Sequence, residues 1–276
     1  MPAPILTCSA NTLRFADLRT RVSSAAAAGF TGIGLRVADY LGAGLADADL
    51  RDLLDRHHLR VLELEHTWDW AAGEDPVEEA VFRFADRIGV RQLNVVMFAV
   101  HPLPDLVRPF AALCDRAAEH GVLVGLEFLP YSHVRTLGQA WEVVAAADRP
   151  NAGIIIDLWH WFRSGAEFED LAAVPASAIT SLQLCDVLAD AGPDLADEAR
   201  HRRLLPGQGA GDTPGVLRAL RERGVTVPVS VEVFSDDLDA RPAEVAARLA
   251  YDAGAATLER TGFTAPSWTT DPEEVR

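Results

Sequence analysis

Short apolar runs recur along the whole chain and predict eight buried strands. Most of these runs are largely apolar, which is typical of a strand that is covered on both faces. The runs lie at residues 5–9, 32–36, 60–66, 92–98, 122–129, 153–159, 181–187 and 227–234.

Segments with a helical repeat of apolar positions separate these runs. Residues 16–30 end on a Gly that usually stops a helix, and residues 76–89 open with a Pro at a first-turn position and close on Gly. The predicted helices lie at residues 16–30, 47–58, 76–89, 104–121, 136–150, 168–179, 213–224 and 241–262.

Strands and helices alternate strictly, which predicts parallel strands covered by helices. Eight such repeats in 276 residues favour an α/β fold, the (β/α)₈ TIM barrel. The alternative is an open doubly wound sheet, but its usual Gly-x-Gly-x-x-Gly motif does not follow the first run. We therefore expect a single barrel domain over residues 1–262. The aperiodic residues 263–276 are expected to form a C-terminal extension that packs on a partner subunit of a homo-oligomer.

The charged residues restrict the classes of function. The formal net charge is −16 at pH 7, which argues against a nucleic-acid surface because phosphate binding needs a basic face. All 25 Lys and Arg positions are arginine. Schiff-base catalysis, pyridoxal phosphate attachment and a Walker-type phosphate loop all require a lysine, so these classes are excluded.

The three cysteines, Cys8, Cys114 and Cys185, lie far apart and lack metal-type spacing. An odd number of separated cysteines is explained most simply by reduced thiols in the cytoplasm. The chain has neither a run of eighteen apolar residues nor a charged-then-apolar leader. We therefore expect neither a membrane span nor a secretory signal.

Polar side chains stand at the ends of the last four predicted strands, where a barrel has its active site. These residues are Glu127, Asp157 with His160, Gln183 with Asp186, and Glu232. Structural explanations exist for each, since a buried Glu can pair with an Arg and Asp157 can cap a helix. However, adjacent strands lie only about 5 Å apart, so the four ends converge. Three carboxylates cannot share a dry site without a cation, and oxygen ligands favour Mg²⁺ or Mn²⁺.

Motifs along nearly the whole chain resemble those of the xylose-isomerase-like barrels, which include sugar phosphate isomerases and epimerases. The motifs are NTL (11–13), AAAAGFTGIGLR (25–36), LEFLP, IIDLWH, LQLCD, LPGQGAGD (205–212) and VSVEVF. The resemblance implies that one divalent ion is bound by Glu127, Asp157, Gln183 and Glu232. It also implies that His160 lies beside the ion and faces the substrate. We expect Mn²⁺ or Mg²⁺, with Co²⁺ or Zn²⁺ as alternatives.

One predicted ligand departs from the commonest pattern of this family. Gln183 stands where the epimerases usually have His, and its neutral amide oxygen shifts the metal preference further toward Mg²⁺ or Mn²⁺. A Gln here, followed by an Arg before LPGQG, resembles the 3-dehydroshikimate dehydratase branch. It also occurs in barrels regarded as sugar isomerases, so both activities stay open.

Further substrate contacts are predicted for one of two neighbouring arginines, for Glu65 and for Trp159. One of Arg202 and Arg203 could clamp a carboxylate or phosphate with its guanidinium fork, the other being an ordinary surface residue. Glu65 ends a predicted strand, where a substrate contact and a structural salt bridge are both open. Trp159 is expected to wall the pocket. The glycines of residues 205–212 could let backbone amides approach an oxyanion.

These residues predict proton abstraction next to the carbonyl group of a small keto-sugar or another polyhydroxylated substrate. Glu127 and Glu232 would act as base and acid on opposite faces of the substrate carbon, while the ion stabilises the enediolate. Epimerisation or aldose–ketose isomerisation would result. If a β-hydroxyl group is expelled instead, the protein is a dehydratase in which His160 is the acid or base. A non-catalytic binding role is a further alternative, and the charge argues against the related endonucleases for abasic DNA.

Overall fold

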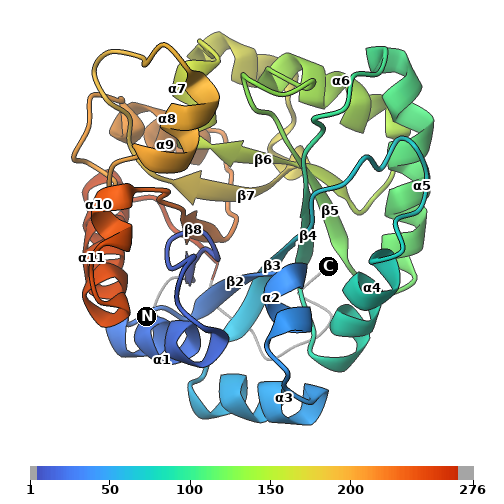
Figure 1. Cartoon of the computed structure of the whole chain (residues 1–276). Coiled ribbons are helices and arrows are strands. Elements are labelled where there is room, and N and C mark those ends of the chain that lie inside the picture. Colours follow the sequence, from blue (N-terminus) through green and yellow to red (C-terminus); the bar gives the residue numbers. More distant parts are fainter. Residues whose placement is uncertain (1–4, 267–276) are drawn as a thin grey trace.

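Eight parallel strands close into a barrel in which each strand pairs with its sequence neighbours (Figure 1). The structure, a computed structural model, describes residues 5–266. The strands are β1 (Leu6–Cys8), β2 (Gly32–Arg36), β3 (Arg60–Glu65), β4 (Gln92–Val95), β5 (Leu123–Glu127), β6 (Ala152–Asp157), β7 (Ile179–Leu184) and β8 (Val229–Val231). Pairing of β1 with β8 closes the barrel. The predicted (β/α)₈ fold is confirmed.

Helices surround the barrel and cover the outer face of its strands (Figure 1). The long ones are α1 (Leu18–Ala28), α3 (Asp47–Arg56), α4 (Glu78–Arg87), α5 (Val107–Ala118), α6 (Leu137–Ala147), α9 (Thr213–Glu222) and α11 (Ala243–Thr261). Shorter ones are α2 (Val37–Gly42), α7 (Leu158–Arg163), α8 (Leu195–His201), α10 (Asp236–Asp239) and the 3₁₀ helix η1 (Leu103–Leu106). Local signals set the helix limits. In α1, the Asp17 side chain accepts from Thr20 N at the start, and Gly29 ends the helix with a φ of 112°.

One predicted helix, at residues 168–179, is wrong. The segment forms two 3₁₀ helices instead, η2 (Phe168–Ala173) and η3 (Ala176–Ala178). Pro175 lies between them, has no N–H to donate and disfavours a helical residue before it. Val174 is accordingly extended. The α-helix of this connection is α7, which begins directly after β6.

The interior of the barrel contains a polar layer below the carboxyl ends of the strands. Glu63 of β3 accepts hydrogen bonds from Ser230 Oγ at 2.6 Å and from Asn94 Nδ2 at 3.2 Å. Gln92 extends the layer by donating to Asn94 Oδ1 and Ser181 Oγ. These side chains are all buried, so the floor beneath the strand ends is hydrogen-bonded and not purely apolar.

The chain beyond α11 packs back onto the barrel. Phe263 is buried, and the carbonyl oxygen of Pro266 accepts a hydrogen bond from Ile5 N at 3.3 Å. The predicted extension at 263–276 therefore begins against the first strand. Residues 267–276 lie outside the described residues, so the predicted domain limits and the packing on a partner subunit stay predictions.

The three cysteines are buried free thiols. Burial raises the pKa of Cys8 and of Cys114 to about 12, so neither thiol is ionised near neutral pH. Between residues 5 and 266, no helix combines the length and the apolar character that crossing a membrane requires. The cytoplasmic location stays a prediction.

Candidate active site

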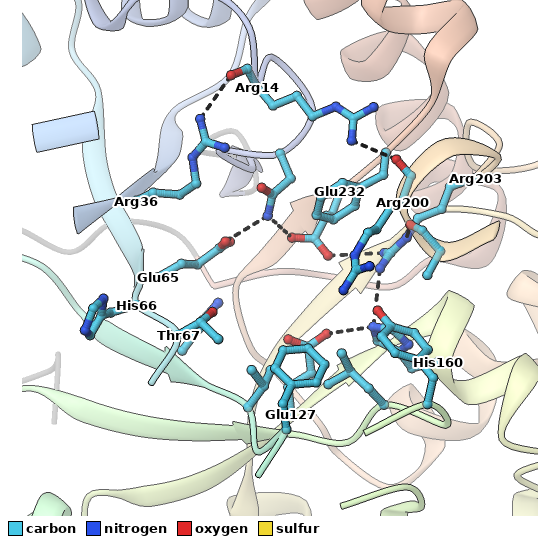
Figure 2. A pocket seen from close by; sticks show the side chains of 18 of the residues that line it. Arg14, Arg36, Glu65, His66, Thr67, Glu127, His160, Arg200, Arg203 and Glu232 are labelled. Atoms are coloured by element: carbon cyan, nitrogen blue, oxygen red, sulfur yellow. Dashed lines mark hydrogen bonds and ion pairs between the residues drawn. The ribbon is translucent and has the colours of Figure 1, made fainter. Parts of the chain in front are cut away.

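A cavity of about 660 Å³ opens at the carboxyl ends of the strands (Figure 2). Its walls come from the ends of β3, β4 and β5, from α7 and α8, and from the segments that follow β1 and β8. Five of the residues singled out in the sequence line it, namely Glu65, Glu127, His160, Arg203 and Glu232. The cavity therefore lies where the barrel pattern predicted an active site.

Asp157, at the end of β6, is both a helix cap and a member of the site. Its Oδ1 accepts a hydrogen bond from His160 N at 2.8 Å and so caps α7. Its Oδ2 accepts from Arg203 Nη1 at 2.7 Å. Burial alone would raise the pKa of Asp157, but the charge of Arg203 and these hydrogen bonds hold that pKa below its ordinary value. The cap and the site thus use different oxygens of one carboxylate.

Glu127, at the end of β5, faces His160 across the cavity wall, with Oε1 3.2 Å from Nε2. Burial, together with the charge of Asp157, raises the pKa of Glu127 to about 8. Burial also lowers the pKa of His160 to about 3, so the imidazole is neutral. Arg203 Nη2 lies 3.3 Å from the same Nε2, and a guanidinium can only donate, so Nε2 accepts and the proton is on Nδ1. The raised pKa of Glu127 fits a protonated carboxyl group that also donates to Nε2.

Glu232 follows β8 and is held at both oxygens. Oε1 accepts hydrogen bonds from Ser9 Oγ at 2.9 Å, Asn11 Nδ2 at 3.1 Å and Gln183 Nε2 at 3.2 Å. Oε2 accepts from Arg203 Nη1 at 3.2 Å. Burial, with the charges of Glu127 and Asp157 partly offset by Arg203, raises the pKa of Glu232 well above its ordinary value. The three donors at Oε1 fix the direction in which this carboxyl group points.

Gln183 supplies the strongest sign that these residues suit a cation. It pairs in register with Asp157 across β6 and β7, and its Nε2 is engaged by Glu232. Its Oε1 is buried without a hydrogen-bond partner among the described residues, which is costly unless a cation or another donor binds there. Glu127, Asp157 and His160 also offer ligand atoms within 4.8 Å of one another. Carboxylate and amide oxygens are the donors that hard divalent ions prefer, so the set fits such an ion.

The two neighbouring arginines have different positions. Arg203 is 2% exposed and lies inside the site, where its Nε also donates to Ala199 O at 2.9 Å. Arg202 points away from the cavity, and its Nη2 pairs with Asp197 Oδ2 at 2.9 Å on the surface. The predicted substrate contact by Arg202 is therefore corrected, because an ion pair holds this side chain outside the pocket.

Trp159 and Glu65 were both predicted to contact the substrate, and the structure separates them. Trp159 is fully buried behind the cavity wall, with its ring perpendicular to that of His160 at 5.2 Å between centroids. It supports the wall and does not line it, which corrects that prediction. Glu65 lines the cavity and accepts from Asn11 Nδ2 at 2.8 Å through Oε2. Burial, reinforced by the charge of Glu232, raises its pKa well above the ordinary value.

Several residues of the site went unnoticed in the sequence. Asn11 joins Glu65 and Glu232 through its one amide nitrogen. Its position directly after the first strand was a usable signal. Glu63 lies below Glu65 on the same inward face of β3, as the two-residue spacing in LELE indicates. Arg200 lines the cavity from α8, and nothing in the local pattern distinguished it from the two arginines that follow it, Arg202 and Arg203.

The glycine-rich loop 205–212 does bring backbone amides to an oxyanion, but that anion belongs to the protein. The carboxylate of Asp186 accepts hydrogen bonds from Gly207 N and Gly211 N at 3.0 Å and from Val187 N at 2.9 Å. Asp186 therefore organises this loop and takes the amides that were candidates for an anion ligand.

Comparison with known proteins agrees with the fold. Residues 22–260 match the family model of the xylose isomerase-like TIM barrel. The chain belongs to this family, as the motifs around the strand ends predicted.

Relatives of this chain fall into two groups by name. This chain is 30% identical over 237 residues to the 3-dehydroshikimate dehydratase of Pseudomonas aeruginosa. The matched segment covers 82% of this chain but only 37% of that protein. The chain is 27% identical over 270 residues to the inosose isomerase of Bacillus velezensis, covering 91% of this chain and 95% of the relative. Compared with the dehydratases, the chain therefore spans well under half of the relative's length.

Solved structures show the same barrel. The IolI protein, determined with a binding zinc atom, superposes with a TM-score of 0.82 at 23% identity, over 95% of this chain and 99% of that one. AsbF from Bacillus anthracis, described as a probable 3-dehydroshikimate dehydratase, gives a TM-score of 0.72 at 16% identity, over 91% of this chain and 98% of that one. At these identities the likeness shows the fold.

Proposed function

We propose that the protein is a divalent-metal-dependent isomerase or epimerase that abstracts a proton next to the carbonyl group of a small polyhydroxylated substrate. The observation behind this proposal is that Glu127 and Glu232 line one cavity and that Asp157 and Gln183 lie buried beside them, with the Oε1 of Gln183 unpartnered among the described residues. The inosose isomerases among the relatives, whose substrate is a polyhydroxylated ketone, support it.

Glu127, Asp157, Gln183 and Glu232 would hold one divalent ion. When bound, the ion would supply Lewis-acid stabilisation of the negative charge that develops on the substrate oxygens. The oxygen-rich ligand set favours Mn²⁺ or Mg²⁺ over Co²⁺ or Zn²⁺. The zinc atom of the IolI structure keeps zinc as an alternative.

Glu127 and Glu232 are proposed to move the proton. They approach the cavity from β5 and β8, and so from different sides of a substrate carbon. Hydrogen bonds at Oε1 orient the Glu232 carboxyl, and Oε2, which accepts one hydrogen bond from Arg203 Nη1, is the oxygen proposed to exchange a proton. The raised pKa of Glu127, about 8, suits a group that takes up and returns a proton near neutral pH. Neutral His160 lies with Nε2 3.2 Å from Glu127 Oε1 and can accept a hydrogen bond from the protonated carboxyl group.

A dehydratase is the second candidate, and Gln183 favours it. Gln at this position resembles the dehydratase branch, and a 3-dehydroshikimate dehydratase is among the relatives. In this case a carboxyl group removes the proton and returns it to the β-hydroxyl group, which the substrate expels as water, while neutral His160 would hydrogen-bond to the leaving oxygen. The two activities share every residue named above, so the substrate decides between them.

The test offers both substrates to the Mn²⁺-loaded protein in D₂O. With an inosose, an isomerase incorporates deuterium next to the carbonyl group, which NMR detects. With 3-dehydroshikimate, a dehydratase gives an aromatic product that absorbs in the ultraviolet. Glu127→Gln should reduce either rate by about 100-fold or more. If neither substrate changes and Glu127→Gln leaves ligand binding intact, the protein has a binding role and the proposed function is wrong.

A further inference from the structure

Four arginines line the cavity (Figure 2). Three of them are paired with carboxylates of the protein: Arg14 with Asp239, Arg36 with Asp39, and Arg203 with Asp157 and Glu232. Each of these cations has at least one carboxylate partner, and Arg36 shares its partner Asp39 with Arg21.

Arg200 differs from the other three. It forms no hydrogen bond or ion pair through its side chain with any of residues 5–266, and its guanidinium carbon lies 6.0 Å from the ring centre of Tyr131. The Tyr131 ring in turn lies 5.7 Å from the ring of His160. Arg14 Nη1 donates to the Arg200 carbonyl oxygen at 2.7 Å and so anchors the end of α8 from which the side chain extends. An exposed cation without an ion-pair partner among the described residues thus lies at the rim of the cavity, one aromatic ring away from His160.

The surroundings of Arg200 indicate what it is for. The chain as a whole has a net charge of −16, which gives it a negative field. Such a field repels anions, so an anionic ligand needs a local cation to enter. A guanidinium binds a carboxylate through two parallel hydrogen bonds, which suits a group with one negative charge.

A phosphate group fits this site less well than a carboxylate. A phosphate carries up to two charges and is usually bound by several backbone amides together with cations. The glycine-rich loop 205–212 could have supplied such amides, but Gly207 N and Gly211 N are engaged by Asp186. A single unpaired arginine without these amides matches one carboxylate.

We infer that Arg200 binds a carboxylate of the substrate, and that the cavity accepts a polyhydroxylated oxo acid in preference to a neutral sugar or a sugar phosphate. The inference rests on the proposed function, because it names the substrate class of the same site. Arg200 acts as the specificity-determining residue, while Glu127, His160 and Glu232 carry out the proton transfer.

Shikimate and methyl shikimate provide a direct test, because they differ in the negative charge of the carboxylate and neither needs to react. Their dissociation constants are measured by calorimetry with the Mn²⁺-loaded protein. The wild-type protein should bind shikimate about tenfold or more tightly than the ester, since a hydrogen bond to a charged group is worth at least that factor. Arg200→Gln should reduce this ratio to near one, and Arg200→Lys should retain part of it.

Arg202→Gln is the matched control. Arg202 stands two positions away at the same end of α8, but it pairs with Asp197 outside the cavity, so this variant should keep the wild-type ratio. A wild-type ratio near one, an unchanged ratio in Arg200→Gln, or equal loss in both variants would overturn the inference. Inorganic phosphate that competes as strongly as shikimate would assign the site to phosphate and overturn it as well.

These outcomes are distinct from failure of the proposed function. If the charge preference depends on Arg200 but no deuterium exchange or aromatic product is found with any substrate, the carboxylate site stands and the proton-transfer proposal falls. If an inosose exchanges deuterium and shikimate shows no preference over its ester, the proposed function stands and the inference about Arg200 falls.

Discussion

Arg203 and Asp157 form a buried ion pair in which Nη1 lies 2.7 Å from Oδ2, and neither side chain is more than 2% exposed. The same Nη1 lies 3.2 Å from Oε2 of Glu232. One guanidinium therefore ties the end of β6 to the end of β8 and balances two carboxylates that burial would otherwise make costly.

Replacing Arg203 should show how far the stability of the fold depends on this buried cation. Arg203→Met leaves Asp157 and Glu232 buried without their cation, and we expect the free energy of unfolding to fall by about 3–5 kcal/mol. Urea denaturation of chelator-treated protein measures it. Arg202→Gln, at the exposed neighbour, should change stability by no more than about 0.5 kcal/mol. Equal, small effects of the two substitutions would show that the buried pair does not stabilise the fold.

The stability of the ion-free protein should depend on pH through Glu127. Its pKa is about 8 in the folded protein against an ordinary 4.5, so between these values the unfolded chain has lost a proton that the folded chain retains. The free energy of unfolding therefore falls as pH rises toward 8, by at most about 1.4 kcal/mol per pH unit for this one group. Glu65 and Glu232, whose pKa values are also raised, act in the same direction.

His160 sets the pH window in which this effect is best seen. Its pKa falls from an ordinary 6.5 to about 3, so it adds stability as pH rises through that range and opposes the carboxyl groups there. Above pH 6.5 it is largely neutral in both states. Urea midpoints measured between pH 6.5 and 8 should decline in the wild type and decline less steeply in Glu127→Gln. Parallel slopes would contradict the raised pKa of Glu127.

Asn11 is expected to act as a positioning residue. Its Nδ2 joins Glu65 Oε2 to Glu232 Oε1, so Asn11→Leu removes one of three donors that orient Glu232. Loss of such a supporting hydrogen bond should lower kcat or metal affinity by about 10–100-fold. Asn151→Ala is the control, because that amide binds Cys114 O and Val122 O away from the cavity. Asn151→Ala should lower the free energy of unfolding without changing kcat or metal affinity. The same loss of activity in both variants would argue against positioning by Asn11.

Asp186 should determine the order of loop 205–212. Three backbone N–H groups donate to its carboxylate, two of them from this loop, so Asp186→Ala leaves them without their acceptor. We expect a loss of about 2–3 kcal/mol in the free energy of unfolding, since hydrogen bonds to a charged group are among the stronger ones. Limited proteolysis should also cleave the variant within the loop. A loop as resistant as in the wild type would show that Asp186 is dispensable for its structure.

The sequence allowed the barrel and much of its site to be predicted. Strand and helix periods are local properties, and the carboxyl end of each parallel strand points to one face, so Glu127, Asp157 and Glu232 could be brought together without coordinates. The helix predicted at 168–179 was wrong because Pro175 interrupts a segment whose apolar spacing is otherwise helical.

The charge pairing within the site could not be predicted in this way. Arg200, Arg202 and Arg203 lie within four positions, and their different partners depend on how α8 is oriented against β6 and β8. One points to the surface, one is buried against Asp157, and one remains unpaired over the cavity. From the sequence, Asp157 could be either a helix cap or a metal ligand. Its carboxylate has two oxygens, and in the structure Oδ1 caps α7 while Oδ2 accepts a hydrogen bond from Arg203.

Titration of chelator-treated protein with Mn²⁺ tests most directly whether the converging carboxylates form a metal site. Calorimetry should detect one ion per chain in the wild type, and Glu232→Gln should weaken binding by about tenfold or more, as loss of a ligand requires. Asp197→Asn, on the surface, should bind as the wild type does. The account predicts one Mn²⁺ that depends on Glu232; no bound ion, or equal affinity in Glu232→Gln and the wild type, would contradict it.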